Sequence, residues 1–158
     1  MTRALRVAAT LALLAACGRK AAPVAPELVR PRAPGALTAA SISDGIRLVW
    51  QRPVSYTSGH HMNDLGQFLI ERSVGEDGEF ANIGVFELDD RQRFRKERRL
   101  EWVDHDVTLG QLYRYRVTSE TIDGYQSKPA GPVSIRHHVP TPEPEKKPEP
   151  EKPKEKKK

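Results

Sequence analysis

Apolar and polar side chains alternate along several short runs between Pro34 and Val139. The clearest runs are 46–51, 68–71 and 113–118, and further apolar runs lie at 37–42, 80–85, 100–103 and 132–136. Successive side chains of a strand point to opposite faces of a sheet, so each run predicts a strand with one buried face. Asp-Gly pairs at 44–45, 77–78 and 123–124 are typical of turns. About seven short strands joined in this way predict an all-β antiparallel sandwich.

The composition allows one such core. The chain has 158 residues, of which 37% are hydrophobic and 30% charged, and this supports a single domain. Thirteen prolines and eleven glycines favour strands and turns over a helical bundle. A single cysteine excludes an internal disulfide framework and a cysteine-rich zinc module.

The order of large residues in 34–139 resembles that of a fibronectin type III domain, which is an immunoglobulin-like sandwich. The resemblance is carried by Leu48-x-Trp50 followed by Pro53, Phe68-x-Ile70-x-Arg72, Trp102-x-Asp104 and Val107-x-Leu109-Gly110-x-x-Tyr113-x-Tyr115-x-Val117. It implies seven antiparallel strands, with Trp50 at the centre of the core. It also implies that Tyr113 is the corner tyrosine, whose hydroxyl bonds to upstream backbone. Leu109 replaces the proline that usually precedes the corner glycine.

Large aromatic residues are the candidates for the core of this sandwich: Trp50, Phe68, Trp102, Tyr113 and Tyr115. Each would bury about 150–250 Å². Their alternative role is a platform on which sugar rings stack. Trp50 and Tyr113 are in phase with inward Leu and Val residues, which favours the core. Trp102 lies nearer an insertion, so the core is favoured over a sugar-binding platform less strongly for Trp102 than for Trp50 and Tyr113.

The first seventeen residues form a targeting segment. Arg3 and Arg6 precede an apolar run at 7–14, which is far shorter than the roughly 20 residues of a membrane span. Leu14-Ala15-Ala16-Cys17 resembles the lipobox of bacterial lipoproteins. The resemblance implies a signal peptide over 1–16, cleavage between Ala16 and Cys17, and a diacylglyceryl thioether with further acylation at Cys17. Gly18 in place of Asp resembles the default signal for export to the outer membrane of a Gram-negative host. An ordinary cleaved signal with an incidental cysteine is the alternative.

Two proline-rich segments flank the predicted domain, and both are expected to be disordered. Residues 17–33 would be a lipidated tether, and residues 140–158 a tail rich in Pro, Glu and Lys. The tail is either a solubilising segment or one that contacts peptidoglycan through its lysines. The start of the tether resembles that of a very small lipoprotein that attends assembly of the lipopolysaccharide translocon. Residues 34–139 carry thirteen Lys or Arg and fifteen Asp or Glu, so the domain is a poor match for nucleic acid.

Two long connections are expected, over 55–67 and 85–99, and loops often carry function. The second contains a candidate patch for an anion or an acidic partner, formed by Arg91, Arg93, Arg95, Lys96, Arg98 and Arg99. Anionic headgroups or lipid A phosphate would suit such a patch. The alternative is a solvated loop or short helix that pairs with its acidic flank, Glu87, Asp89 and Asp90.

No motif in the chain indicates catalysis, a metal or a cofactor. The pairs His60-His61 and His137-His138 have no Cys or nearby carboxylate at a ligand spacing. Asp104 and Asp106 are expected to accept turn amides. Nucleophile-elbow, metalloprotease and phosphate-loop motifs are missing from the sequence. The protein is therefore expected not to be an enzyme and to need no cofactor.

The sequence thus predicts a monomeric lipoprotein of the cell envelope, anchored in a membrane by acyl chains. In a Gram-negative host this would be the outer membrane. Its domain would serve as a non-catalytic interaction or spacer module, with an envelope protein or polysaccharide as partner. The alternatives are an accessory factor of outer-membrane assembly, at the lipopolysaccharide translocon, and a carbohydrate-binding module.

Overall fold

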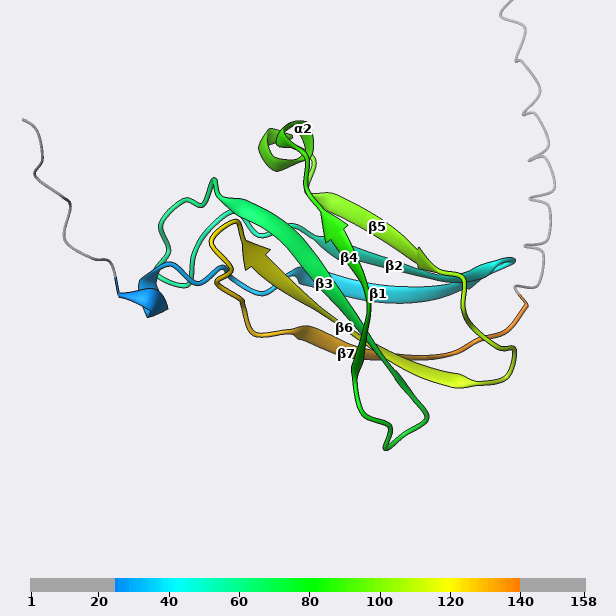
Figure 1. Ribbon diagram of the computed structural model, residues 1–158. Helices are drawn as coiled ribbons and strands as arrows, with labels where there is room; N and C mark the ends of the chain where they lie inside the picture. Colours follow the sequence, from blue (N-terminus) through cyan, green and yellow to red (C-terminus); the bar gives the residue numbers. More distant parts are fainter. Residues whose placement is uncertain (1–24, 140–158) are drawn as a thin grey trace, which may run out of the picture.

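The structure, a computed structural model, describes residues 25–139 as two antiparallel sheets packed face to face (Figure 1). One sheet has the order β1 (Gly35–Ile42), β2 (Gly45–Gln51), β5 (Arg99–Asp104). The other has the order β4 (Ala81–Glu87), β3 (Leu65–Val74), β6 (Leu112–Thr121), β7 (Ala130–Arg136). Two short helices, η1 (Pro26–Leu28) and α2 (Asp90–Phe94), lie outside the sheets. The predicted seven-stranded antiparallel sandwich is confirmed.

The first long connection lies three residues earlier than predicted, and the second is shorter than predicted. β3 begins at Leu65 rather than after Gln67, because Leu65 is buried and pairs with Thr121 of β6. β4 continues to Glu87, whose partner in the ladder is Gln67. The connections therefore cover 52–64 and 88–98, and the second contains α2. Both are partly anchored, since Met62 and Leu88 contribute buried side chains to the core.

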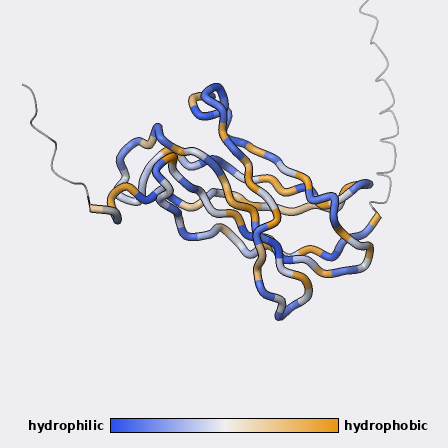
Figure 2. The backbone as a smooth tube through the Cα atoms, in the orientation of Figure 1, coloured by the Kyte–Doolittle hydropathy of each residue, from blue (hydrophilic) through white to orange (hydrophobic). Residues whose placement is uncertain are grey.

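The core lies between the two sheets and is built on the predicted aromatic residues. Trp50, Phe68 and Tyr115 are fully buried, and Tyr113 is nearly so. The Trp50 ring meets the Phe68 ring edge-on, with centroids 5.5 Å apart, and this is a favourable arrangement for aromatic pairs. Trp102 is half-buried and packs against the core from β5. In Figure 2 the strands mix hydrophobic and hydrophilic residues, whereas the loop that carries α2 is mostly hydrophilic.

Tyr113 forms the corner that the resemblance implies. Its hydroxyl accepts a hydrogen bond from the Thr108 backbone N–H at 2.8 Å. Gly110 has a φ of +79°, which a residue with a side chain rarely adopts. The turn therefore forms with Leu109 in the place of the usual proline, and Leu109 itself is exposed.

Several predictions fall outside the described residues. These are the signal peptide 1–16, the cleavage and lipidation site at Ala16 and Cys17, the first part of the tether, and the tail 140–158. Within 25–139, no helix is both long enough and apolar enough to cross a bilayer.

Candidate functional site

The two ends of the sandwich carry opposite charge. The end at which β1 begins, here called the basic pole, gathers segments 25–34, 52–64, 88–98 and 122–129, which hold nine Lys or Arg and six Asp or Glu (Figure 1). The other end, the acidic pole, gathers segments 43–44, 75–80, 105–111 and 137–139, which hold five Asp or Glu and neither Lys nor Arg. Anions are therefore expected to approach at the basic pole.

The N-terminal segment, residues 27–32, packs on the basic pole, whereas the prediction was a disordered tether that continues to Ala33. The Thr57 hydroxyl donates to the Glu27 carbonyl at 2.8 Å, and the Thr57 N–H donates to the Arg30 carbonyl at 2.8 Å. The Ser58 hydroxyl donates to the Leu28 carbonyl at 2.9 Å. Pro31 is fully buried and pairs with Tyr56. The predicted tether thus differs from the structure from residue 27 onward, because hydroxyls of the 52–64 connection hold the chain.

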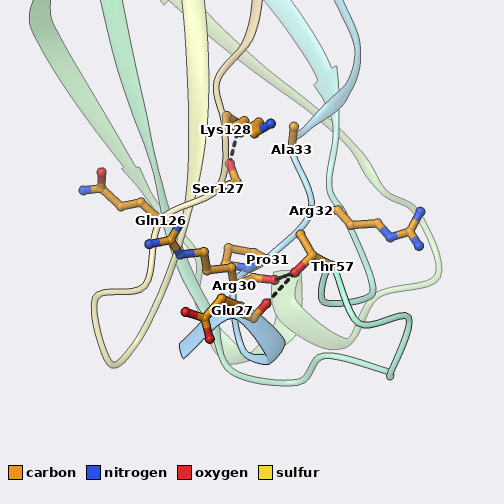
Figure 3. Close-up of a pocket in the computed structure, with 9 residues that line it drawn as sticks. All are labelled: Glu27, Arg30, Pro31, Arg32, Ala33, Thr57, Gln126, Ser127 and Lys128. Carbon is orange, nitrogen blue, oxygen red and sulfur yellow. Dashed lines mark hydrogen bonds between the residues drawn. The ribbon is translucent and has the colours of Figure 1, made fainter. Parts of the chain in front are cut away.

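A cleft of about 520 Å³ lies beside this docked segment (Figure 3). Its lining combines the N-terminal segment and Thr57 with Gln126, Ser127 and Lys128. The charged side chains around it belong to exposed residues, and the dashed bonds in Figure 3 join hydroxyls to backbone carbonyls within the protein. The cleft consequently has no buried charge that would select a ligand.

The six residues of the predicted arginine patch are not equivalent in the structure, because Arg93 of α2 is bonded within the protein. Asp89 caps α2 by accepting from the Gln92 N–H at 2.6 Å, and the Gln92 side chain accepts from the Asp89 N–H at 3.1 Å. This capping box explains why the helix begins here. Arg93 then pairs with Asp90 at 2.9 Å and donates from Nε to the Leu65 carbonyl at 2.9 Å. Arg93 therefore agrees with the alternative prediction, in which the basic loop pairs with the acidic residues that precede it.

Three further basic residues of the loop lie beside a second cavity of about 410 Å³. It lies between the connection at 52–64 and the loop residues 93–98, and Arg95, Lys96 and Arg98 line one side of it. Arg91 in α2 and Arg99 at the start of β5 are exposed and do not line this cavity. Of the six predicted residues, Arg95, Lys96 and Arg98 line the cavity, and Arg91 and Arg99 do not. Arg93 also lines it, but its side chain is bonded to Asp90 and to the Leu65 carbonyl.

Arg52 is the functional candidate that the sequence reasoning missed. It lines the second cavity and is only 6% exposed. Its Nη2 donates to the Arg95 carbonyl at 2.9 Å, while its Nε has no partner within the described residues. Burial, together with the positive charge of Arg98, lowers the pKa of Arg52. A signal was present in the sequence, because Arg52 continues the inward phase of Leu48 and Trp50.

A second buried charge, at the acidic pole, is fully partnered. Asp104 accepts from Arg72 Nη1 at 2.8 Å and from the Tyr115 hydroxyl at 2.8 Å. It also accepts the Asp106 N–H at 3.1 Å, which is the turn bond predicted for it. Burial and the Asp104 carboxylate raise the pKa of Tyr115. Arg72 is in β3 and Asp104 in β5, so the cluster joins the two sheets.

The histidine pairs do not gather with other ligands. His60 and His61 are exposed on the 52–64 connection, whereas His137 is buried with Nδ1 3.3 Å from the Ser41 hydroxyl. In the part of the chain that is described, no group of three or more His, Cys, Asp or Glu is placed to hold a metal ion.

A row of exposed aromatic rings, which a carbohydrate-binding face would need, is also missing from residues 25–139. The large hydrophobic side chains exposed there include two aromatic ones, Phe94 in α2 and Tyr125 in a loop. They come from different loops and lie on no strand.

Comparison with known proteins leaves the fold as the shared property. No family of known proteins and no curated protein matches the chain. Among solved structures, a β-1,2-glucanase from Parabacteroides distasonis has a TM-score of 0.50 at 18% identity, over 75% of this chain and 14% of that one. The twitchin kinase region from C. elegans has a TM-score of 0.49 at 18% identity, over 68% and 16%. An Fn3-like protein from Clostridium thermocellum has a TM-score of 0.44 at 16% identity, over 72% and 97%.

The class of domain follows from the topology. Three strands in the order β1-β2-β5 face four in the order β4-β3-β6-β7, and a tyrosine corner precedes the long β6 ladder. This is the arrangement of a fibronectin type III-like domain.

Proposed function

We propose that this protein is a lipid-anchored lipoprotein of the cell envelope, whose fibronectin type III-like domain is a non-catalytic interaction or spacer module. The observation that carries the proposal is the sequence Leu14-Ala15-Ala16-Cys17 at the end of a short basic and apolar leader. Acyl chains on Cys17, each burying methylenes worth about 0.8 kcal/mol apiece, would hold the protein on a membrane.

The docked N-terminal segment determines which end of the domain would face that membrane. Glu27, whose carbonyl is bonded to Thr57, is only ten residues after Cys17 in the sequence. Ten extended residues span at most about 35 Å. The basic pole would therefore stay close to the lipid surface, where anionic headgroups attract Lys and Arg. The acidic pole would face away from it.

A non-catalytic role agrees with how the buried polar groups are used. The Asp104 carboxylate already holds Arg72, the Tyr115 hydroxyl and a backbone N–H. These groups satisfy one another and join the sheets, so this cluster offers no free acid or base. A rigid sandwich with functional loops at its ends is a common scaffold for binding.

The anchor is tested by mass spectrometry of the N-terminal peptide from the native bacterium and by membrane fractionation. We expect cleavage before Cys17 and a mass increase equal to the acyl groups, and we expect Cys17→Ser to abolish both. Gly18→Asp is the matched control, since it should keep the acylation and change at most the membrane in which the protein resides. An unmodified thiol, or a leader still attached, would overturn the anchor.

The interaction role is tested by crosslinking in the native envelope. The acylated protein is captured and compared with a chain that ends at Val139. A spacer should crosslink to partners through its ends, so the truncated chain should lose the partners contacted by the tail. Recovery of the full-length protein without any crosslinked partner would overturn the interaction role.

A further inference from the structure

We propose that the cavity beside Arg52 is a binding site for a phosphate group, held by Arg52 together with Arg95, Lys96 and Arg98. This site goes beyond the proposed module, because it assigns a ligand class to one place on the basic pole. It does not depend on the lipid anchor.

The lining of the cavity has an unbalanced charge. Its residues include Arg52, His61, Arg93 and three further basic side chains, and neither Asp nor Glu is among them. Arg93 is neutralised by Asp90. Within residues 25–139, Arg52, Arg95, Lys96 and Arg98 are in no salt bridge with a carboxylate. A dianion entering the cavity would therefore meet four positive charges that the described protein leaves uncompensated.

Arg52 makes the site more than a charged surface. A buried guanidinium is normally paired with a carboxylate, because removing its charge from water is costly. Here the residue is only 6% exposed, and its guanidinium donates to a backbone carbonyl of the same basic loop rather than to a carboxylate. Burial and Arg98 lower its pKa, yet an arginine in a protein remains charged. An anion would supply the missing countercharge.

The chemistry of the donors favours phosphate. A guanidinium presents a planar fork of N–H donors that matches two oxygens of a phosphate or carboxylate. The cavity, at about 410 Å³, is larger than a phosphate ion and falls within the usual range of ligand pockets. Val54, Met62 and Phe94 supply apolar lining. We therefore expect a phosphate that is attached to a larger organic group.

Bonds that do not use the side chains of Arg52, Arg95, Lys96 or Arg98 hold the walls of the cavity in place. The Arg93 side chain fixes the loop to the Leu65 carbonyl, and the Arg52 N–H donates to the Arg98 carbonyl at 2.7 Å. The Met62 N–H donates to the Val54 carbonyl at 2.9 Å, which closes the opposite wall. A preformed cradle requires little ordering when the ligand binds.

The decisive experiment is calorimetric titration of the full-length protein in nonionic detergent at about 0.15 M salt, at which surface charges are screened beyond about 8 Å. Two probes are used, inorganic phosphate and glycerophosphoglycerol, which is the phosphodiester headgroup of phosphatidylglycerol without its acyl chains. We expect saturable binding of at least one probe. Preference for inorganic phosphate indicates a free phosphate or phosphomonoester, and preference for the headgroup indicates a lipid.

Two double variants separate the cavity from general charge. Arg95→Ser with Arg98→Ser removes two cations that line the cavity, whereas Arg91→Ser with Arg99→Ser removes two exposed cations close by in the sequence that do not line it. We expect the first pair to weaken binding about tenfold or more and the second pair to weaken it less than about twofold. Equal losses in the two pairs would overturn the proposal, as would failure of the unaltered protein to bind either probe.

Arg52→Lys tests the fork itself, because lysine keeps the charge as a point without paired donors. We expect binding to weaken while the circular dichroism spectrum stays unchanged. Binding as strong as that of the unaltered protein would remove Arg52 from the site. If this variant does not fold, the two double variants decide the question. A negative result would leave the anchored module in place, since acylation of Cys17 is measured separately.

Discussion

Replacing Asp104 by asparagine would remove the charge that links the two sheets at the acidic pole. Asp104 is 3% exposed and accepts hydrogen bonds from Arg72, Tyr115 and the Asp106 N–H. An asparagine amide has one acceptor oxygen, and its NH₂ group would face donors. Arg72 would then lose its buried countercharge. Breaking a buried pair in this way costs about 3–5 kcal/mol, and we expect the lower end because the Arg72 side chain is 15% exposed.

Asp106→Asn is the matched control for this prediction. Asp106 also pairs with Arg72, at 3.1 Å, but its side chain is 95% exposed. An exposed pair is worth at most about 1 kcal/mol. The two substitutions make the same chemical change two residues apart, next to the same arginine, so burial is the variable that separates them.

Both variants would be measured by equilibrium urea unfolding of the full-length protein, followed by circular dichroism and tryptophan fluorescence. We expect Asp104→Asn to lower the free energy of unfolding by about 3 kcal/mol and the thermal midpoint by about 12–24 °C, with an unchanged urea slope. If the two variants lose the same stability, the Asp104 cluster does not hold the sheets together.

Four further outcomes are expected. Trp50→Ala should lower the free energy of unfolding by about 3–5 kcal/mol, because the ring is fully buried; an unchanged urea midpoint would take Trp50 out of the core. Because the pKa of Tyr115 is raised in the folded protein, the unfolded chain loses the Tyr115 hydroxyl proton at a lower pH than the folded protein does. The contribution of Tyr115 to the free energy of unfolding should therefore be constant below about pH 10 and fall above it by up to about 1.4 kcal/mol per pH unit. Tyr115→Phe should reduce that slope in urea titrations across this range and leave the part due to Tyr56, whose pKa burial and Asp64 raise to about 12; an unchanged slope would assign it to another group. Gly84→Ala would place a Cβ 2.9 Å from Trp102 Cζ2 and should lower the free energy of unfolding by about 1–3 kcal/mol. The double variant with Trp102→Phe should regain part of this stability, whereas an unchanged stability of Gly84→Ala would mean that the two sheets can separate freely at this edge. Thr57→Val should release the docked N-terminal segment and speed tryptic cleavage after Arg32, and an unchanged cleavage rate would show that the hydroxyl bond to Glu27 is dispensable.

The strands were predictable because their signal is local. Alternation around Trp50, Phe68 and Tyr113 specifies which face of each strand is buried, and the structure buries those residues. Strand ends were less accurate, since the start of β3 at Leu65 depends on its partner in β6.

The candidate site was only partly predictable, because its parts meet through distant contacts. Arg93 is withdrawn from the patch by a carbonyl 28 residues away in the sequence, and the N-terminal segment is held by Thr57, 30 residues from Glu27. No local pattern contains these pairs. Arg52 and Arg72 were different, since each continues the inward phase of an apolar run by one further step. If the alternation had been extended to charged residues, it would have predicted that Arg52 and Arg72 face the core.

The two ends of the described chain leave the sandwich at opposite poles (Figure 1), and this has a mechanical consequence. β1 and β7 both run from the basic pole to the acidic pole, and each is hydrogen-bonded to an antiparallel neighbour, β2 or β6. A pull on the two ends would first peel residues 27–32 from Ser55–Ser58, and would then load the ladders of β1 and β7 in shear. Ladder bonds lie perpendicular to the strands, so many would share the force together instead of opening one by one. We therefore expect the described domain to resist tension along its length.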